Sequence, residues 1–532
     1  MLRGRLLLRG IFFSMLHPIY GGKAMFKSLR YLVAVLCVSF CLLVLPIFIT
    51  GSCNKANNHP ATKFKTTETS LGRIVEGGIP ESLVASPDCG HVAYAVKRGE
   101  KQFAVIDGVE GKEYDGINYN VIVFSPDSKR VAYVAQRAEK QFVVIDGVEG
   151  KEYDGAFEHT LIFSPDSKHI AYGAKRGDKC FMVVDGVEGK EYNGILHNSA
   201  VFSPDSTRIA YAARLDGKSL VVVDGLEGKE YDDIGVGPPT FSPDSKRVAY
   251  IAFRGRQELA VIDGVEGTEC HQVDWLKFSP DSQHVAYGGQ REEKTFMVVD
   301  GIEGKEYSWS FAFSPDSKHF AYVIARARKY SVVIDGIEGK VYDMASPPIF
   351  SPDCKRWAYN ARRGDEEFAV VDGVEGKGYH VITLNTTIFS PDSTRAAYGG
   401  ARLTNHGWKW QMVVDGVEGK EYDGAALPIF SPDSRHIAYA AKRGEKWIAV
   451  VDGVEGKEYD LIGEPVFSPD SKHTAYVAGR GEKWFTVVDG LEGKEYDGFL
   501  NGSILVFDSP TKLHTLAIRG GEIFLVEIEI TE

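Results

Sequence analysis

Histidine recurs at one position of a motif in this sequence, and imidazole is a common metal ligand. It stands three residues after the aspartate of a Ser-Pro-Asp string, at His91, His169, His284, His319, His436 and His473. Other copies of the motif carry arginine there, at Arg130, Arg208, Arg247, Arg356 and Arg395. A guanidinium group does not ligate metal ions. We therefore expect a basic side chain beside a turn aspartate, and no metal site.

Two aspartates recur with the same regularity. The first belongs to Ser-Pro-Asp, which occurs eleven times, and the second to an Asp-Gly pair that follows each copy, first at Asp107. Catalysis needs one set of groups at one place, whereas aspartates in turns bond to their own backbone. The sequence also lacks a G-x-S-x-G elbow, an H-E-x-x-H pair and a P-loop. No catalytic residue, metal ion or cofactor is predicted.

The elements that position these residues form one unit, repeated every 35–41 residues. In residues 121–159, VIVFS is followed by a Ser-Pro-Asp turn, then by RVAYVAQR, QFVVID and KEYDG. Short apolar runs separated by turn residues are typical of hairpin-connected strands. An all-β chain of such four-stranded units is typical of a β-propeller with one unit per blade.

The ends of the repeat array add a twelfth blade. Residues 503–530 match its first three strands, and residues 72–79 are expected to supply the fourth by pairing near 523–530. The sequence thus predicts about twelve four-stranded blades over residues 72–532. Because propellers usually have four to eight blades, we favour two six-bladed propellers, with one large ring as the alternative. No linker marks an internal boundary.

The blade motif resembles that of a known family. FSPDS is followed by Lys, then Arg or His, an aliphatic residue and Ala-Tyr, as at 124–133. This string is similar to the WD-repeat-like blade of TolB-type propellers, and the resemblance covers roughly residues 83–530. It implies a β-propeller fold and a TolB-like role in binding or scaffolding.

The N-terminal 52 residues are interpreted as an export signal or a membrane anchor. Residues 31–49 are apolar and uncharged, with Lys27 and Arg30 before them, and the true start could be Met25. The run ends in Thr-Gly-Ser before Cys53, which resembles a lipobox and predicts lipid modification of Cys53. An uncleaved anchor and ordinary cleavage remain alternatives. All three place the remaining chain, beginning with a polar tether at 53–71, outside the cytoplasm.

Charge and cysteine content narrow the possible partners. The net charge of −12 disfavours nucleic acid. The eleven nine-residue Asp-Gly hairpins together carry −28, which predicts one acidic face with diffuse cation attraction and no tight metal site. The cysteines after Cys53 lack a ligand or disulfide pattern: Cys89, Cys180, Cys270 and Cys354.

The blade-to-blade segments vary while the motifs barely change. Residues that fold a blade must recur, whereas residues that bind a partner need not, so we place the ligand-binding surface on the face of these segments. The candidates are Asn118, Tyr119, His159, His197, Trp275, Trp309, His380, Trp408 and Trp410. The predicted function is an extracytoplasmic binding or scaffold propeller for a protein, peptide or cell-envelope glycan. The alternative is a propeller hydrolase or lyase with its site on one face.

Overall fold

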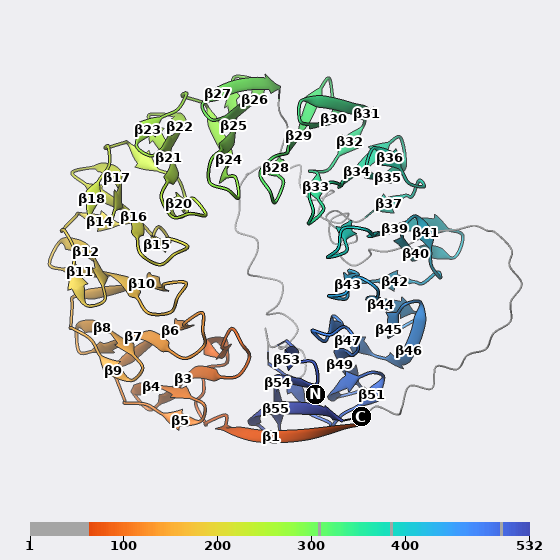
Figure 1. Ribbon diagram of the computed structural model, residues 1–532. Helices are drawn as coiled ribbons and strands as arrows, with labels where there is room; N and C mark the ends of the chain where they lie inside the picture. The colour runs from red at the N-terminus through yellow and green to blue at the C-terminus, as the bar shows by residue number, and fades with distance from the viewer. Residues whose placement is uncertain (1–62, 307–309, 383–386, 501–503, 532) are drawn as a thin grey trace, which may run out of the picture. The chain divides into compact units, whose positions relative to one another are not determined.

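The computed structural model describes residues 63–306, 310–382, 387–500 and 504–531. Their strands form twelve sheets, which confirms the all-β propeller of twelve four-stranded blades (Figure 1). In seven sheets one of the four strands is split in two or accompanied by a short extra strand. The helical content of the described residues is one 3-10 turn, η1 (Pro80–Ser82). None of their helices is long and apolar enough to cross a membrane.

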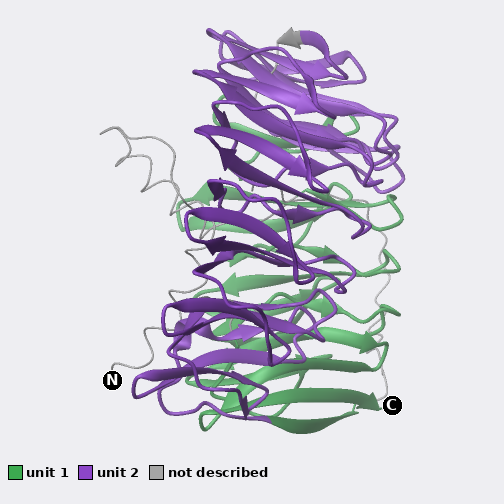
Figure 2. Ribbon diagram, turned by 90° about the vertical axis from the view of Figure 1, so that its left-hand side faces the viewer, with its two compact units in different colours: residues 1–70, 362–532 green, residues 71–361 purple. Residues whose placement is uncertain are grey.

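The chain divides into two compact units (Figure 2). Unit 2, residues 71–361, holds seven complete sheets that span 84–110, 116–149, 155–188, 194–227, 233–266, 272–306 and 311–342. Unit 1, residues 1–70 and 362–532, holds the sheets that span 381–418, 424–459, 461–492 and 498–531, the last together with β1 (Lys63–Arg73). The division falls within the sheet over 344–375, so it does not follow the expected partition into two sets of six blades.

The second blade shows how the sequence produces a sheet. Its strands β6 (Gly116–Phe124), β7 (Val131–Arg137), β8 (Lys140–Ile145) and β9 (Val148–Glu149) follow one another in sequence order. The first five residues of β7 are all buried, because neighbouring blades cover both faces of the sheet. This explains why the second strand of each repeat is almost wholly apolar.

The Ser-Pro-Asp turn is held by its own side chains. Ser125 Oγ donates to Asp127 Oδ1 at 2.7 Å and accepts from the backbone N–H of Arg130 at 3.0 Å. The Lys129 N–H also donates to Asp127 Oδ1, at 3.2 Å. The hydrogen bonds from the Ser125 hydroxyl and the Lys129 N–H lower the pKa of Asp127 to about 2. Asp127 N–H in turn donates to Ser167 Oγ of the next blade at 2.9 Å. Serine at this last turn position therefore links consecutive blades.

The Asp-Gly hairpin lies at the same end of the blade as that turn. Asp146 and Gly147 both have positive φ, at 52° and 77°, as a two-residue type I′ hairpin requires. Asp146 Oδ1 accepts from Val131 N–H at 2.9 Å, and its Oδ2 accepts from Arg130 Nε at 3.0 Å. The recurring basic residue therefore binds the recurring aspartate. In the histidine blades Nδ1 takes the same place, as between His169 and Asp185 at 2.6 Å.

The strand that completes the last blade differs from the expected one. β55 (Glu522–Thr531) lies between β54 (Lys512–Arg519) and β1, so the added strand is Lys63–Arg73 rather than residues 72–79. Most of β1 falls in the range interpreted as a tether. Residues 77–79 instead lie against the first blade, where Gly78 pairs with Val96. The resemblance of GRIVEGGI to the repeat's fourth strand does not predict the pairing, because Glu68 of β1, and not Glu76, accepts from Lys494 and Arg519.

Candidate functional site

In most of the described sheets the segments that differ between blades interrupt the first strand. In β6, Ile117 pairs with Ala135 but Ile122 already pairs with Tyr133, so residues 118–121 bulge out of the ladder. The same break separates Phe157 from Ile162 in β10 (Gly155–Phe163). Our expectation placed these segments in loops at one face, but the structure places them along the first-strand edge. In unit 2 these first strands lie on the inner side of the row of sheets (Figure 1).

Two candidate histidines come together at this edge. His159 in β10 and His197, between β14 (Gly194–Ile195) and β15 (Val201–Phe202), are both exposed, and their ring centroids are 5.4 Å apart. Nε2 of His159 also lies 3.3 Å from Oε1 of Glu158. Consecutive blades thus contribute to one polar patch. In the described part of the chain, no group of three or more histidine, cysteine or acidic side chains is arranged to hold a metal ion.

A third candidate, Trp275, is exposed beside a cation. It lies in the bulge of β24 (Gln272–Phe278) with φ at 57°, and its side chain is 54% exposed. Lys277 Nζ lies 5.4 Å from the centroid of the Trp275 ring and 5.7 Å from that of Phe311. The bulge therefore presents an aromatic ring with a positive charge over it.

Unit 1 carries an aromatic group at an extended hairpin. Strands β39 (Ala396–Thr404) and β40 (Gly407–Val414) are longer than their counterparts, and Leu403 pairs with Trp408 near the tip. The His380 and Trp408 rings are 6.2 Å apart in an edge contact. Sequence reasoning missed Leu403, which is exposed. The lengthened spacing between the motifs at Ser390 and Ser431 pointed to this hairpin.

Trp410 does not belong to the surface, and this candidate was wrong. Its side chain is fully buried among Tyr379, Tyr422 and Ile448. Trp408 and Trp410 share one side of β40, but Trp410 pairs with Ala401, well inside the ladder. The adjacent blade covers the strand at that depth, which a pattern of alternating residues does not reveal.

The remaining candidate residues add no support for a binding site. Asn118 is half-buried in the bulge of β6. The side chain of Tyr119 and all of Trp309 and Cys53 lie outside the described residues. Cys89, Cys180, Cys270 and Cys354 are buried and form no disulfide, as expected.

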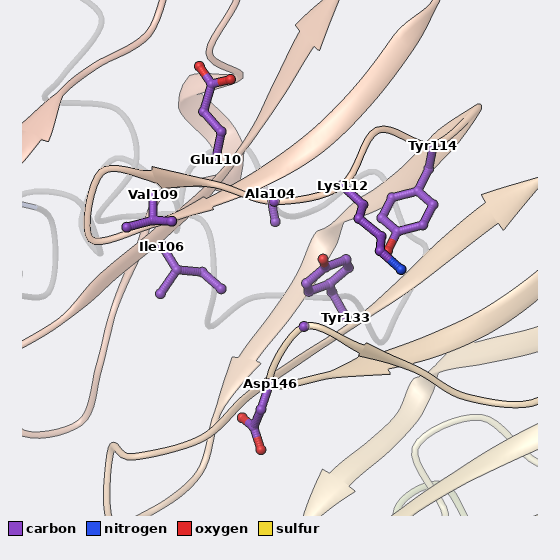
Figure 3. Close-up of a pocket in the computed structure, with 10 residues that line it drawn as sticks. Ala104, Ile106, Val109, Glu110, Lys112, Tyr114, Tyr133 and Asp146 are labelled. Atoms are coloured by element: carbon purple, nitrogen blue, oxygen red, sulfur yellow. The ribbon is translucent and has the colours of Figure 1, made fainter.

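A cavity opens at the opposite, hairpin end of the blades. It has a volume of about 500 Å³ and lies between the first two blades of unit 2. Ala104, Ile106 and Val109 form an apolar wall, while Tyr114 and Tyr133 line another part (Figure 3). Its charged residues are Glu110, Lys112 and Asp146.

The charges of this hairpin end are largely paired. Glu149 accepts from Arg137 of its own blade at 2.8 Å and from Lys112 of the preceding blade at 3.2 Å. Glu188 of the next blade is held in the same way. Its pKa is lowered to about 2, mainly by the hydrogen bond from Arg176 of its own blade and then by that from Lys151 of the second blade. The predicted acidic face therefore carries carboxylates that cations from other strands largely offset. The arginine at the end of the second strand, such as Arg137 or Arg176, supplies part of this compensation.

Comparisons with known proteins assign no family to this chain. No family model and no curated protein matches the sequence. TolB from Acinetobacter baumannii is 17% identical, with a TM-score of 0.21 over 48% of this chain and 77% of that one. A eukaryotic initiation factor is 12% identical, with a TM-score of 0.32 over 62% and 96%. The GH74 enzyme of Niastella koreensis is 11% identical, with a TM-score of 0.22 over 85% and 99%. None of these likenesses indicates what this chain binds.

Proposed function

We propose that this chain is an exported binding propeller that holds a protein or peptide partner along the first-strand edges of its blades. One observation carries the proposal: the exposed side chains of His159, His197 and Trp275 lie at the interrupted first strands, in segments whose sequence differs from blade to blade. The rest of each blade repeats because it folds the sheet. A surface that varies on a constant scaffold is typical of recognition.

The side chains at these edges, and at the extended hairpin of β39 and β40, suit a polypeptide partner. Trp275 and Trp408 offer large rigid apolar surfaces, and tryptophan is enriched among residues that dominate protein interfaces. Lys277 and His380 beside them can satisfy polar groups of the partner. The pairing of one aromatic ring with one polar group recurs on both units, so each unit can anchor a polypeptide segment by itself.

Export rests on the sequence of the first 52 residues, which lies outside the described part. We propose that Cys53 is the lipid-modified first residue of the mature protein. Mass spectrometry of the mature N-terminus tests this. An unmodified Cys53 within an intact N-terminal segment would favour an uncleaved anchor.

The binding proposal is tested by capture on the full chain. Proteins cross-linked to the wild type in cells are compared with those cross-linked to Trp275→Ala and Trp408→Ala. The control is Val341→Ala, which is 56% exposed and lies away from the first-strand edges. We expect loss of a common partner in both tryptophan variants, with affinity reduced about tenfold or more, and no loss in the control. Capture of the same proteins by every variant contradicts the proposal. Binding or cleavage of cell-envelope glycans alone favours the glycan or enzyme alternative.

A further inference from the structure

The hairpin end carries a row of exposed aliphatic side chains. The residue after each Asp-Gly is always Val, Leu or Ile. In unit 2 these side chains are 69–76% exposed, and they belong to Val109, Val148, Val187, Leu226, Val265, Ile302 and Ile337. Single exposed aliphatic residues are ordinary on protein surfaces. Seven at one position of seven consecutive blades require an explanation.

Folding explains every other constant residue of the hairpin. Asp146 and Gly147 adopt the positive φ of the turn. Glu149 binds the neighbouring blade, and a Cβ on Gly150 would lie 3.0 Å from the carbonyl oxygen of Val143. Val148 needs only an extended backbone, for which threonine serves as well. The aliphatic residue is thus constant without a structural reason.

A hollow lies beside this protruding side chain. In the first blade Val109, Ile106 and Ala104 line the 500 Å³ cavity that separates the hairpin from that of the second blade (Figure 3). The hairpin surface therefore offers both a projecting aliphatic group and an apolar recess to receive one.

We infer that the hairpin end of unit 2 is a self-association surface, occupied by the same surface of a second copy of this chain. A partner that contacts seven equivalent positions must present its own contact residues at the same spacing. A second copy of this chain carries the same row of residues and therefore meets this requirement. A two-fold contact also requires a self-complementary surface. Five of the seven hairpins supply one as a Lys-Glu pair. Lys112 and Lys151 bind Glu149 and Glu188 of the same chain but remain 68% and 62% exposed, beside the exposed carboxylates of Glu113 and Glu152. Lysines of one copy can face glutamates of the other.

The surface is independent of the first-strand edges that carry the proposed function. It lies at the hairpin end of the blades, so a partner at those edges and a second copy need not compete.

The test measures the mass of the full chain in non-ionic detergent by light scattering over a range of concentrations. The mass of the wild type should rise with concentration from that of one mature chain and its micelle toward that of two chains. Replacing all seven aliphatic residues by threonine should weaken association by about tenfold or more, because many small contacts act together. The matched control, Val236→Thr with Leu427→Thr, removes two exposed aliphatic side chains outside the row and should associate as the wild type does.

A variant with fewer substitutions keeps the test valid if the sevenfold variant does not fold. Val148→Thr, Val187→Thr and Leu226→Thr change only three consecutive blades and should weaken association in the same direction. The inference is overturned if the wild type stays a single chain at every concentration. It is overturned equally if the threonine variants associate like the control. It is also overturned if these variants lose binding to phosphatidylcholine vesicles while their self-association stays unchanged.

Discussion

The carboxylate of Glu68 in β1 accepts hydrogen bonds from both terminal nitrogens of Arg519 in β54, at 2.7 and 3.1 Å. Lys494 Nζ and the Tyr496 hydroxyl also donate to this carboxylate, at 2.9 and 2.8 Å. Glu149 of the second blade has partners of the same three residue types, namely Arg137, Lys112 and Tyr114. Glu68 therefore takes the place of the repeat's hairpin glutamate, although no recognisable repeat surrounds it.

Replacing Glu68 by glutamine should destabilise unit 1. Arg519, followed by Lys494 and Tyr496, lowers the pKa of Glu68 to about 2 from 4.5, and its side chain is only 13% exposed. A depressed folded pKa contributes stability above about pH 4.5, which is lost as the pH falls toward 2. We expect a loss of about 1–3 kcal/mol at pH 7, measured by denaturant unfolding. The difference from wild type should shrink below pH 4.

A matched control for Glu68 is available in the same sheet. Glu529 pairs with Lys512 at 3.2 Å but is 48% exposed. Glu529→Gln should cost less than about 0.5 kcal/mol. Equal losses in the two variants would show that Glu68 contributes no more than a surface ion pair.

Replacing Glu367 by glutamine should have the opposite effect. Burial raises the pKa of Glu367, so ionisation at neutral pH costs stability that the protein regains as the pH falls through the folded pKa. Its carboxylate accepts from Ile382 N–H at 2.7 Å, and Gln141 makes the same bond to Ala156 N–H at 2.9 Å. We expect Glu367→Gln to raise the melting temperature by about 1–2 °C at pH 7. No gain at pH 7, or a gain that persists at pH 4, contradicts this account.

The two neighbouring tryptophans should respond very differently to truncation. Trp410→Ala empties a fully buried site and should cost about 3–5 kcal/mol. Trp408→Ala removes a partly exposed ring and should cost less than about 1 kcal/mol. Urea unfolding of both variants distinguishes the core residue from the surface candidate, and similar costs would contradict the assignment.

The exchange of arginine and histidine between blades should be measurable. Both bind the hairpin aspartate, but Arg130 Nη1 also donates to the carbonyls of Ser167 and Lys168 in the next blade, at 3.3 and 3.1 Å. Imidazole is too short to make these bonds. Arg130→His should therefore cost about 0.5–1.5 kcal/mol in urea unfolding, and His169→Arg should not. Equal effects would mean that the link between blades contributes nothing.

Calcium should find no saturable site on the hairpins. Their carboxylates are already engaged, as Glu149 is by Arg137 and Asp154 by Lys140 at 2.6 Å. Ca²⁺ needs six to eight oxygen ligands and would have to displace these cations. We expect calorimetric titration in physiological salt to show only weak heat without saturation. Stoichiometric micromolar binding would move the functional surface to the hairpins.

The sequence by itself determined the repeat, the turns and the blade. Positive φ at Asp-Gly and the side-chain bonds of Ser-Pro-Asp are local, so residues within five positions of one another suffice to specify them. The sequence also predicts a basic residue beside a turn aspartate, but only the structure shows that it binds the aspartate of the Asp-Gly hairpin, 16 residues away. Periodicity then fixed the number of blades.

Only the tertiary structure decided features that depend on contacts between distant segments. The strand that completes the last blade contacts residues more than 400 positions away, as Glu68 does with Lys494 and Arg519, and no local pattern encodes these contacts. Burial of Trp410 depends on the neighbouring blade, and the break in β6 depends on its register against β7. Such choices follow from packing and pairing across the fold, where the free energy of a residue is set by its neighbours in space.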